Sequence, residues 1–427
     1  MSMVSCLYNL FLFIFGLFSL PKLLWKKKNS WKMLKAKLGL ELPILSKERT
    51  TLKPVFWIHA VSLGETRAAI PLVRLIKQKF PKSCLVVSST TETGFDEAKK
   101  SLAEADSRFF LPLDFSSVMR KLVSMVKPDV LILMEGEFWY HLLQEAKTQG
   151  AAILLANGKL SEISRERFAL FSFFTKRLFS LIDHFCLQSS CHEERFLELG
   201  ISKEKMTVTG NLKFDTPVQR LTASEKEYWK MELGIGPDDR LLTIGSTHAS
   251  EEKRLLTALL PLFQEIPHLK VLLVPRHPER FLEVKALLER SEMPFLVYSK
   301  REEKNFRERV VLMDEMGLLR TCYQLSELAL VGGSFIRGIG GHNVFEPIQC
   351  GIPVLFGPHM EAQRDFTHLL LQAQAARQLS LEELPRALLE LFQNGQLRAR
   401  MTASGDKLIK CSKGALQRTW EQVLERV

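Results

Sequence analysis

The chain has 427 residues, and its hydrophobic content of 46% and charged content of 25% exclude an intrinsically disordered protein. Its length is too great for one ordinary hydrophobic core, so we expect two domains. The formal net charge of +11 favours an anionic partner such as a membrane surface, a phosphate group or nucleic acid.

The first 25 residues predict an N-terminal membrane anchor. No charged side chain occurs between residues 1 and 21, and the apolar run is just long enough to cross a bilayer or to lie in its interface. Seven lysines follow between Lys22 and Lys37, which places the body of the protein at the cytoplasmic face, on anionic inner-membrane lipids. The alternatives are a core helix and a cleaved signal peptide, although a signal peptide carries its basic residues before the apolar run.

Beyond residue 50, β-rich runs alternate with amphipathic stretches, which predicts an α/β protein with two Rossmann-like domains. The strands expected in the first half are 55–60, 84–89, 109–113, 130–134, 153–156 and 184–188. The strands expected in the second half are 241–245, 271–274, 295–298, 310–313, 328–331 and 353–356.

A polar segment around Pro217 separates the two series and predicts the interdomain linker. We expect an N-terminal domain over residues 26–213, a C-terminal domain over 214–405, and a final helix over 406–427 with the option of packing on the N-terminal domain. Two such domains that face each other form a cleft, and ligands of parallel sheets bind at the carboxyl ends of the strands.

The end of the first expected strand carries Ser62, Gly64 and Glu65. Gly64 permits a sharp turn, and Glu65 begins an amphipathic helix whose dipole favours an ionised carboxylate. An ionised carboxylate suits a general base, although an ordinary first-turn acid explains the same pattern.

Two carboxylates, Glu135 and Glu137, follow the strand expected at 130–134. Buried acids without partners are costly, so this pair is a candidate to position hydroxyl groups, to bind a cation or to cap the next helix. Asn157 and Lys159 continue the same edge, and Lys213 lies near the expected hinge.

In the second half, successive strands end in small donors, a basic pair and a turn able to read the edge of a base. These are Ser246 and Thr247, Arg276 and His277, and Met316 and Gly317.

A glycine-rich loop follows the strand expected at 328–331, with five glycines between Gly332 and Gly341. A helix expected to begin near Asn343 would direct N–H groups at a phosphate, and Glu346 could hold a ribose. The pattern suggests a nucleotide-sugar pocket, or else a tight strand–helix turn in which Glu346 is only a helix-start charge. The candidate ligand contacts here are Gly333, Ser334, Gly341, His342, Asn343 and Glu346.

Several common catalytic motifs are absent from the chain. There is no P-loop, no GxSxG, no HExxH and no Cys-x-x-Cys pair among the seven scattered cysteines, so no cofactor and no zinc site is expected. The absence of Asp-x-Asp favours a nucleotide site that works without a metal.

Eight segments together resemble one family, the 3-deoxy-D-manno-octulosonic acid (Kdo) transferases of Gram-negative lipid A assembly. They are HAVSLGE (59–65), EGEFW (135–139), NGKLSE (157–162), GNLKFD (210–215), GSTH (245–248), VPRHPER (274–280), DEMGLL (314–319) and GGSF…GGHNVFEP (332–347).

The resemblance implies a GT-B glycosyltransferase fold, CMP-Kdo as the donor and a lipid A precursor as the acceptor. It implies Glu65 as the general base, Glu135 as a second required acid and Lys213 as a basic residue facing the cleft. It also implies contacts to cytidine monophosphate from five positions: Arg276, Met316, Gly317, Asn343 and Glu346.

The chain departs from the family pattern on the acceptor side. Gly158 and Lys159 stand where many members have Ala-Arg, and Tyr140 stands where many have proline. The segment NGKLSE looks like that of chlamydial members, and the number of Kdo units added stays open. The rivals are a lipid A disaccharide synthase with a uridine donor and a non-catalytic nucleotide-binding membrane protein. A nucleic-acid binder is disfavoured because the lysines cluster beside the anchor.

Overall fold

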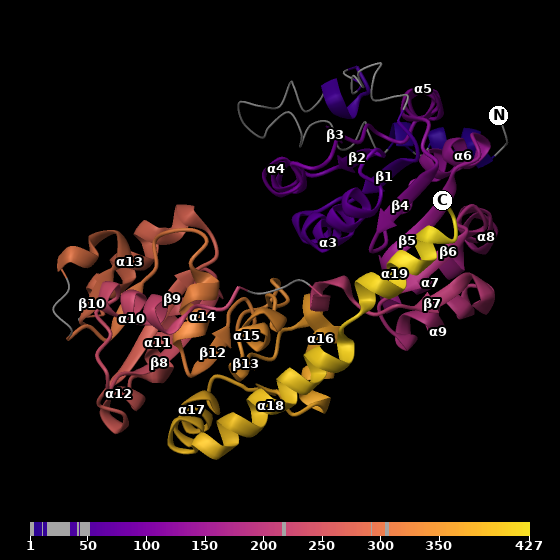
Figure 1. The fold of residues 1–427 in the computed structure, drawn as a ribbon. Helices are drawn as coiled ribbons and strands as arrows, with labels where there is room; N and C mark the ends of the chain where they lie inside the picture. The colour runs from indigo at the N-terminus through magenta and orange to yellow at the C-terminus, as the bar shows by residue number, and fades with distance from the viewer. Residues whose placement is uncertain are drawn as a thin grey trace. The chain divides into compact units, whose positions relative to one another are not determined.

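The structure is a computed structural model that describes residues 4–10, 12–14, 35–40, 42, 52–215, 219–291, 293–303 and 307–427. The chain divides into two compact units, Met1–Pro217 with Ser412–Val427 and Val218–Cys411 (Figure 1). Each unit is built on one seven-stranded sheet in which every pair of neighbouring strands is parallel. The prediction of two parallel-sheet α/β domains is therefore confirmed.

The first sheet has the strand order β3-β2-β1-β4-β5-β6-β7. Its strands are β1 (Val55–His59), β2 (Cys84–Ser89), β3 (Ser107–Phe110), β4 (Val130–Met134), β5 (Ala152–Gly158), β6 (His184–Leu187) and β7 (Met206–Val208). Its helices are α3 (Leu63–Lys79), α4 (Glu92–Ser101), α5 (Ser116–Val126), α6 (Tyr140–Thr148), α7 (Glu162–Leu170), α8 (Ser172–Ser180), α9 (Ser190–Glu198) and α19 (Ala415–Leu424). The strand order reverses between β1 and β4, where ligands of doubly wound sheets bind.

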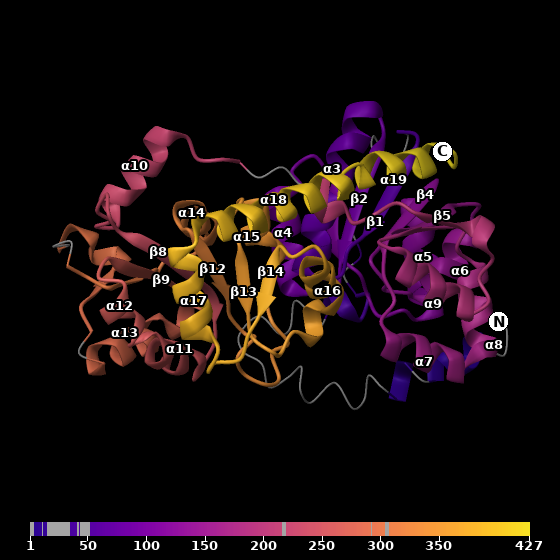
Figure 2. The same ribbon diagram turned by 90° about the horizontal axis from the view of Figure 1, so that it is seen from below.

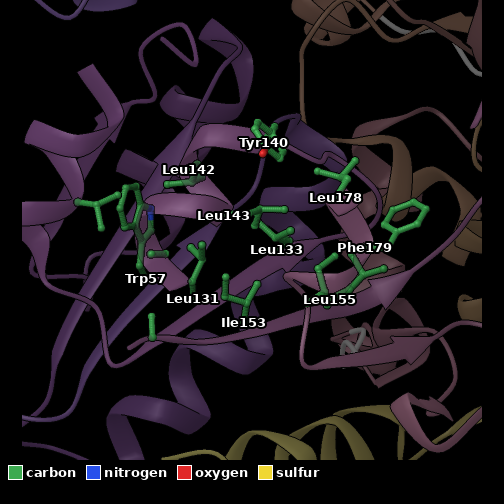
Figure 3. Packing of buried hydrophobic residues seen from close by; sticks show 14 of the residues in the cluster. Trp57, Leu131, Leu133, Tyr140, Leu142, Leu143, Ile153, Leu155, Leu178 and Phe179 are labelled. Carbon is green, nitrogen blue, oxygen red and sulfur yellow. The ribbon is translucent and has the colours of Figure 1, made fainter. Parts of the chain in front are cut away.

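Both faces of this sheet are covered, because side chains alternate along each buried strand. Trp57 and Leu131 pack toward α5, α6 and α8 (Figure 3). Phe56 and Ile58 point to the opposite face and pack on α3, α4 and α19. The result is a three-layer unit whose strand ends are held rigidly.

The C-terminal helix α19 belongs to the first unit, where it contacts α3, β5 and β6 (Figure 2). Trp420 is buried and its ring lies 5.9 Å from that of Phe80. The carboxylate of Asp215, in the 3-10 helix η3 (Leu212–Asp215), accepts from the backbone N–H groups of Gly414 and Leu416 at 2.7 and 2.6 Å. The start of α19 is therefore tied to the last segment of the first unit before the chain enters the second.

The second sheet has the order β10-β11-β9-β8-β12-β13-β14, and it reverses between β8 and β12. Its strands are β8 (Arg240–Thr247), β9 (Leu269–Pro275), β10 (Phe295–Val297), β11 (Val310–Leu312), β12 (Leu328–Val331), β13 (Val354–Phe356) and β14 (Ala376–Gln378). Its helices are α10 (Ala223–Glu232), α11 (Glu251–Leu259), α12 (Leu262–Glu265), α13 (Phe281–Arg290), α14 (Leu319–Leu325), α15 (Phe345–Gln349), α16 (Arg364–Gln372), α17 (Leu384–Gln393) and α18 (Gly395–Ser412).

The boundaries differ from the expected ones by a few residues. The first unit extends to Pro217 rather than 213, because η3 still packs on α3 and α19. The second unit extends to Cys411 rather than 405, because α18 is continuous to Ser412 and Gly405 lies against Ile348. The edge strands β7 and β14 were not expected, since each has three residues of which one is buried.

The N-terminal segment lies only partly within the described residues. Residues 4–10 and 12–14 are helical, whereas 15–34, with Lys22 to Lys32 of the basic run, lie outside the described residues. In the described part of the chain, no helix has the length and apolarity needed to cross a membrane.

The described N-terminal residues contact the first unit. Ser5 Oγ lies 2.8 Å from His141 Nε2, the Tyr8 ring stacks on that of Phe174, and Asn9 Nδ2 donates to Ser116 Oγ at 3.0 Å. One face of this segment is therefore used for packing.

Candidate active site

Glu65 lies at the carboxyl end of β1, in the first turn of α3. Ser62 caps the helix by accepting from Glu65 N, while Glu65 Oε2 accepts from Val61 N at 2.8 Å and Glu65 Oε1 accepts from Ser62 Oγ at 3.0 Å. The turn thus holds the carboxylate in one position, as a reciprocal cap does. The structure shows the capping role, which fixes a buried carboxylate that is 7% exposed, while the role as a general base stays a prediction.

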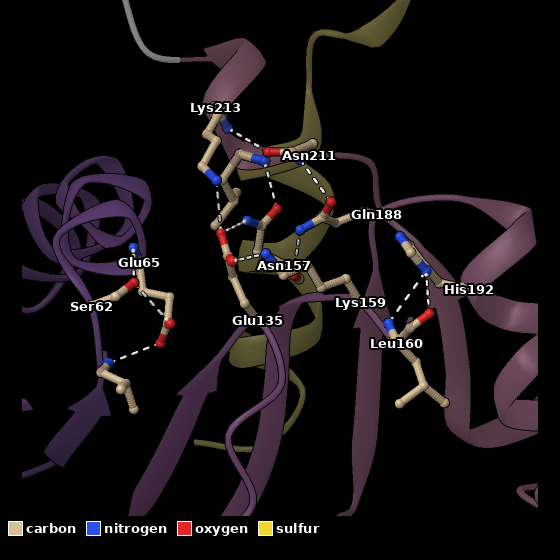
Figure 4. A network of polar contacts seen from close by, with 12 residues as sticks. Ser62, Glu65, Glu135, Asn157, Lys159, Leu160, Gln188, His192, Asn211 and Lys213 are labelled. Carbon is tan, nitrogen blue, oxygen red and sulfur yellow. Dashed lines mark hydrogen bonds and ion pairs between the residues drawn. The ribbon is translucent and has the colours of Figure 1, made fainter. Parts of the chain in front are cut away.

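Glu135 lies at the end of β4, the strand beside β1, and is 5% exposed. Its carboxylate is paired with Lys159 Nζ at 2.5 Å and with Lys213 Nζ at 2.9 Å (Figure 4). Asn157 Nδ2 donates to Glu135 Oε1 at 3.4 Å, and Asn157 Oδ1 accepts from Leu212 N at 3.0 Å. Four of the predicted residues, from β4, β5 and η3, therefore form one polar network at the edge of the sheet.

The two carboxylates have opposite electrostatic environments. Burial raises the pKa of Glu65 to about 7, and the negative charges of Glu135 and Glu137 contribute to that rise. Burial also acts on Glu135, but Lys213 and Lys159 hold the pKa of that carboxyl below its ordinary value. Groups whose surroundings push their pKa values apart can take different roles, and a carboxylate that titrates near neutral pH suits a general base. Gly64 and the exposed Glu137 flank this pair.

In the second unit, the glycine loop after β12 is held by a carboxylate from the same unit. Glu251 begins α11, is fully buried, and accepts from the backbone N–H groups of Gly333, Ser334 and Phe335 at 2.7, 3.1 and 3.0 Å. It also accepts from His248 N at 3.2 Å. The backbone N–H groups of Gly333 and Ser334, two of the candidate ligand contacts, therefore donate to a carboxylate of the same unit.

Close packing within the protein explains why Gly333 is glycine. Its φ is +67°, and a Cβ there would lie 2.7 Å from Ile339 Cγ2 and 3.0 Å from His342 Cδ2. A side chain would therefore displace the histidine ring. Ser334 is buried as well, and its Oγ accepts from Gly357 N at 2.8 Å.

The helix after this loop, α15, is short and its start is already capped. Asn343 Oδ1 accepts from Phe345 N at 3.1 Å, so the amide oxygen occupies the first free N–H. Glu346, in the first turn, is paired with Arg320 Nε at 2.6 Å. The Glu346 carboxylate therefore already has a cationic partner within the second unit, and its contact with a ribose stays a prediction. Gly341 lies just before α15, with φ of +78°.

The remaining predicted residues lie at the carboxyl ends of strands of the second sheet or in the loops that follow them. Ser246 has φ of +59°, and Thr247 is fully buried with no hydrogen-bond partner for Oγ1 in the described part of the chain. Arg276 and His277 follow β9. Met316 and Gly317 form the turn before α14, and Met316 is exposed.

Two residues of this site were not singled out from the sequence. His248 Nε2 lies 2.6 Å from His342 Nε2, and Glu251 anchors the loop that carries His342. The signal for His248 was its place in the segment GSTH. For Glu251, the sequence indicated only an acidic residue in the first turn of a helix, which is common in helices with no functional role.

The comparisons with known proteins place these residues in context. A family model described as 3-deoxy-D-manno-octulosonic-acid transferase (kdotransferase) matches residues 33–216. A protein of that name from Chlamydophila psittaci is 36% identical over 97% of this chain and 95% of its own length. The namesake from Haemophilus influenzae is 32% identical over 85% of this chain and 84% of its own length.

Solved structures support the fold alone. The UDP-GlcNAc 2-epimerase of Neisseria meningitidis matches 87% of this chain and 99% of its own, with a TM-score of 0.61 and 15% identity. A glycosyltransferase of Rickettsia africae matches 88% of this chain and 99% of its own, with a TM-score of 0.58 and 13% identity. The two parallel-sheet domains thus resemble those of GT-B proteins.

Replacing Glu251 with alanine tests its role in the loop. Four backbone N–H groups would lose their acceptor, and since each buried unsatisfied donor costs about 1–3 kcal/mol, we expect the free energy of unfolding of the second unit to fall by about 4 kcal/mol or more. Urea unfolding followed by circular dichroism measures this. Lys253→Ala, an exposed site on the same helix, is the control. An unchanged midpoint for Glu251→Ala would contradict the anchoring role.

Proposed function

Since this chain belongs to the 3-deoxy-D-manno-octulosonic acid (Kdo) transferase family, we propose that it moves Kdo from CMP-Kdo to a lipid A precursor. The proposal is an inverting transfer that needs no metal. The observation that carries it is Glu65, a fixed carboxylate whose pKa is raised to about 7, at the point where the strand order of the first sheet reverses.

The proposed reaction is one direct displacement. Glu65 takes the proton from a hydroxyl of the acceptor sugar, and that oxygen attacks the anomeric carbon of Kdo. The bond between that carbon and the phosphate oxygen breaks on the opposite face, so cytidine monophosphate leaves and the configuration inverts. Lys159 and Lys213 keep Glu135 negatively charged, and this charge contributes to the raised pKa of Glu65, which is about 7.

The decisive experiment is transfer from CMP-Kdo to a tetra-acylated lipid A precursor, with the purified protein in detergent and a chelator present. A mass gain of one or more Kdo units supports the proposal and counts the additions. Transfer from a uridine donor instead would support the rival disaccharide synthase. Nucleotide binding without transfer from either donor would support the non-catalytic alternative.

Replacement of Glu65 by alanine removes the proposed base. We expect transfer to fall by about two orders of magnitude or more, on the usual scale for losing a general base, while CMP binding is retained. The matched control is Glu92→Ala, an exposed first-turn acid at the start of the neighbouring α4. Turnover near that of the wild type in the Glu65 variant would remove the assignment.

The rate of transfer should depend on pH through the same carboxyl group. A base must be deprotonated to accept a proton, and the pKa of Glu65 is raised to about 7, so transfer should rise with pH up to about 7. Below that value the rate should fall about tenfold per pH unit. A profile that stays flat down to pH 5, the range of an ordinary glutamate, would contradict the role of Glu65.

We also propose that the N-terminal segment docks the enzyme on the inner membrane at the cytoplasmic face, lying in the interface. Its inner face carries Ser5, Tyr8 and Asn9, which contact the first unit. Its outer face is apolar and exposed at residues 7, 10, 13 and 14. A helix that packs with one face and exposes an apolar face suits a position in the membrane interface. The lysines that follow it in the sequence suit contact with anionic lipids.

A second apolar surface lies on the same unit. The α7–α8 turn exposes Leu170, Phe171 and Phe173, and Phe174 of α8 stacks on Tyr8 of the N-terminal segment. Exposed apolar clusters of this kind mark membrane or protein contacts. Both surfaces would bring the first unit to the bilayer that holds an acylated acceptor.

Vesicle binding tests this surface. Burying a phenylalanine contributes about 1.5–3 kcal/mol, so the double variant Phe171→Ser, Phe173→Ser should bind anionic phospholipid vesicles at least about tenfold more weakly. The control is Leu282→Ser, an equally exposed apolar site on α13 of the second unit. Equal binding of the double variant and the control in a sedimentation assay would exclude the α7–α8 turn from the docking surface.

A further inference from the structure

Three histidines meet where the strand order of the second sheet reverses. His248 follows β8, His277 follows β9, and His342 lies in the glycine loop after β12. The Nε2 atoms of His248 and His342 are 2.6 Å apart and their ring planes differ by 7°. The His277 ring lies 5.2 Å from that of His248, at 78° to it. All three rings are partly exposed.

A contact of 2.6 Å between two ring nitrogens requires one shared proton. One Nε2 donates its N–H, and the other Nε2 must accept with its lone pair. The accepting ring is neutral when its own proton lies on Nδ1. The pair as a whole is therefore neutral when it carries two protons, one on each ring. A third proton gives the pair a positive charge, which neighbouring basic groups disfavour.

The surroundings of the pair are basic. Burial and then the neighbouring His248, Arg276 and His277 lower the pKa of His342 to about 4, and burial followed by His277 and Arg280 lowers that of His248. The negative charge that acts on His248 comes from Glu252, whose carboxylate is itself paired with Arg280 at 2.5 Å.

The other acids near the cluster are also engaged. Glu251 accepts His248 N, but its carboxylate is bonded to the glycine loop, and Glu279 reaches only to 3.9 Å from His277 Nδ1. Since the N–H groups of Gly333 and Ser334 bind Glu251, an anion at this site would be neutralised by side chains instead. Burial is the largest cause of the lowered pKa of both histidines, and an anion beside the pair would offset the second cause, which is the charge of the neighbouring basic groups.

We propose that the His248–His342 pair, with Arg276, binds the phosphate of the nucleotide and takes up one proton as it does so. The inference rests on the proposed function and deepens it. When the bond between the anomeric carbon and the phosphate oxygen breaks, its electron pair stays on that oxygen and the pair gives it the proton. Glu65 keeps the proton of the acceptor hydroxyl, and both groups then exchange protons with water. The pair therefore acts as the acid of the reaction.

Calorimetry in two buffers of different ionisation enthalpy counts the protons taken up when CMP binds the full-length protein. At pH 7.5, where free CMP is mostly a dianion, linkage predicts an uptake of about 0.5–1 proton per CMP. Cytidine, which lacks the phosphate, should bind without uptake. The variants His248→Gln and His342→Gln keep a polar side chain that cannot titrate, and each should bring the uptake close to zero.

The matched control is His268→Gln. His268 is exposed and precedes β9, at the opposite end of the strand from His277. It should keep the proton uptake, the CMP affinity and the rate of the wild type. A second readout is transfer above neutral pH. The wild type should lose rate as the acid is deprotonated, whereas the two glutamine variants should be slower and lack that alkaline limb.

The outcomes separate the inference from the proposed function. CMP binding and Kdo transfer without proton uptake in the wild type, or with uptake unchanged in both glutamine variants, overturn the role of the pair alone. Failure of CMP to bind the wild type overturns the donor assignment and the inference together. If either glutamine variant fails to fold, the wild-type proton count with CMP against cytidine still decides the question.

Discussion

The carboxylate of Glu251 accepts hydrogen bonds from the backbone of Gly333, Ser334 and Phe335, and this contact joins the ends of β8 and β12. The loop that it holds carries His342, and Gly333 leaves the space in which that ring lies. Without this buried carboxylate, several backbone N–H groups would lack an acceptor, and the conformation of the loop would be destabilised. The conformation of the glycine loop in the second unit therefore depends on this contact.

In the first unit, a buried carboxylate is stabilised by cations instead of backbone N–H groups. Glu135 is only 5% exposed, yet the ammonium groups of Lys159 and Lys213 favour its charged form. Its charge then acts on Glu65, whose own partners are only the backbone of Val61 and the hydroxyl of Ser62. Three buried carboxylates thus serve three purposes, because one is paired with cations, one with backbone donors, and one is left to titrate near neutral pH.

The proposed acid and base occupy equivalent places in the two units. Glu65 follows the first strand of its sheet and His248 follows the first strand of the other, both beside the point where strand order reverses. Parallel sheets leave this position open because neighbouring connections run to opposite faces. In the proposed reaction, Glu65 of the first unit accepts a proton from the acceptor, and the His248–His342 pair of the second unit gives one to the leaving phosphate.

The sequence by itself determined the fold class, most strand positions and the family. Buried strands such as β2 and β4 were predicted to the residue, because fully buried parallel strands are uninterrupted apolar runs. The edge strands β7 and β14 were missed because each has only three residues, of which one is buried, one half-buried and one exposed, and these leave no such pattern. The sequence also singled out Glu135 and Lys213, whose side chains the structure pairs at 2.9 Å.

Only the tertiary structure decided what those side chains bind. That Glu251 occupies the N–H groups of the glycine loop, and that His248 meets His342, depends on residues 82 to 94 positions apart in the chain. Spacing along a sequence records local geometry, whereas hydrogen-bond partners and pKa shifts arise from contacts across the sheet. A glycine-rich loop therefore has the same appearance in the sequence whether its donors face a ligand or a buried carboxylate.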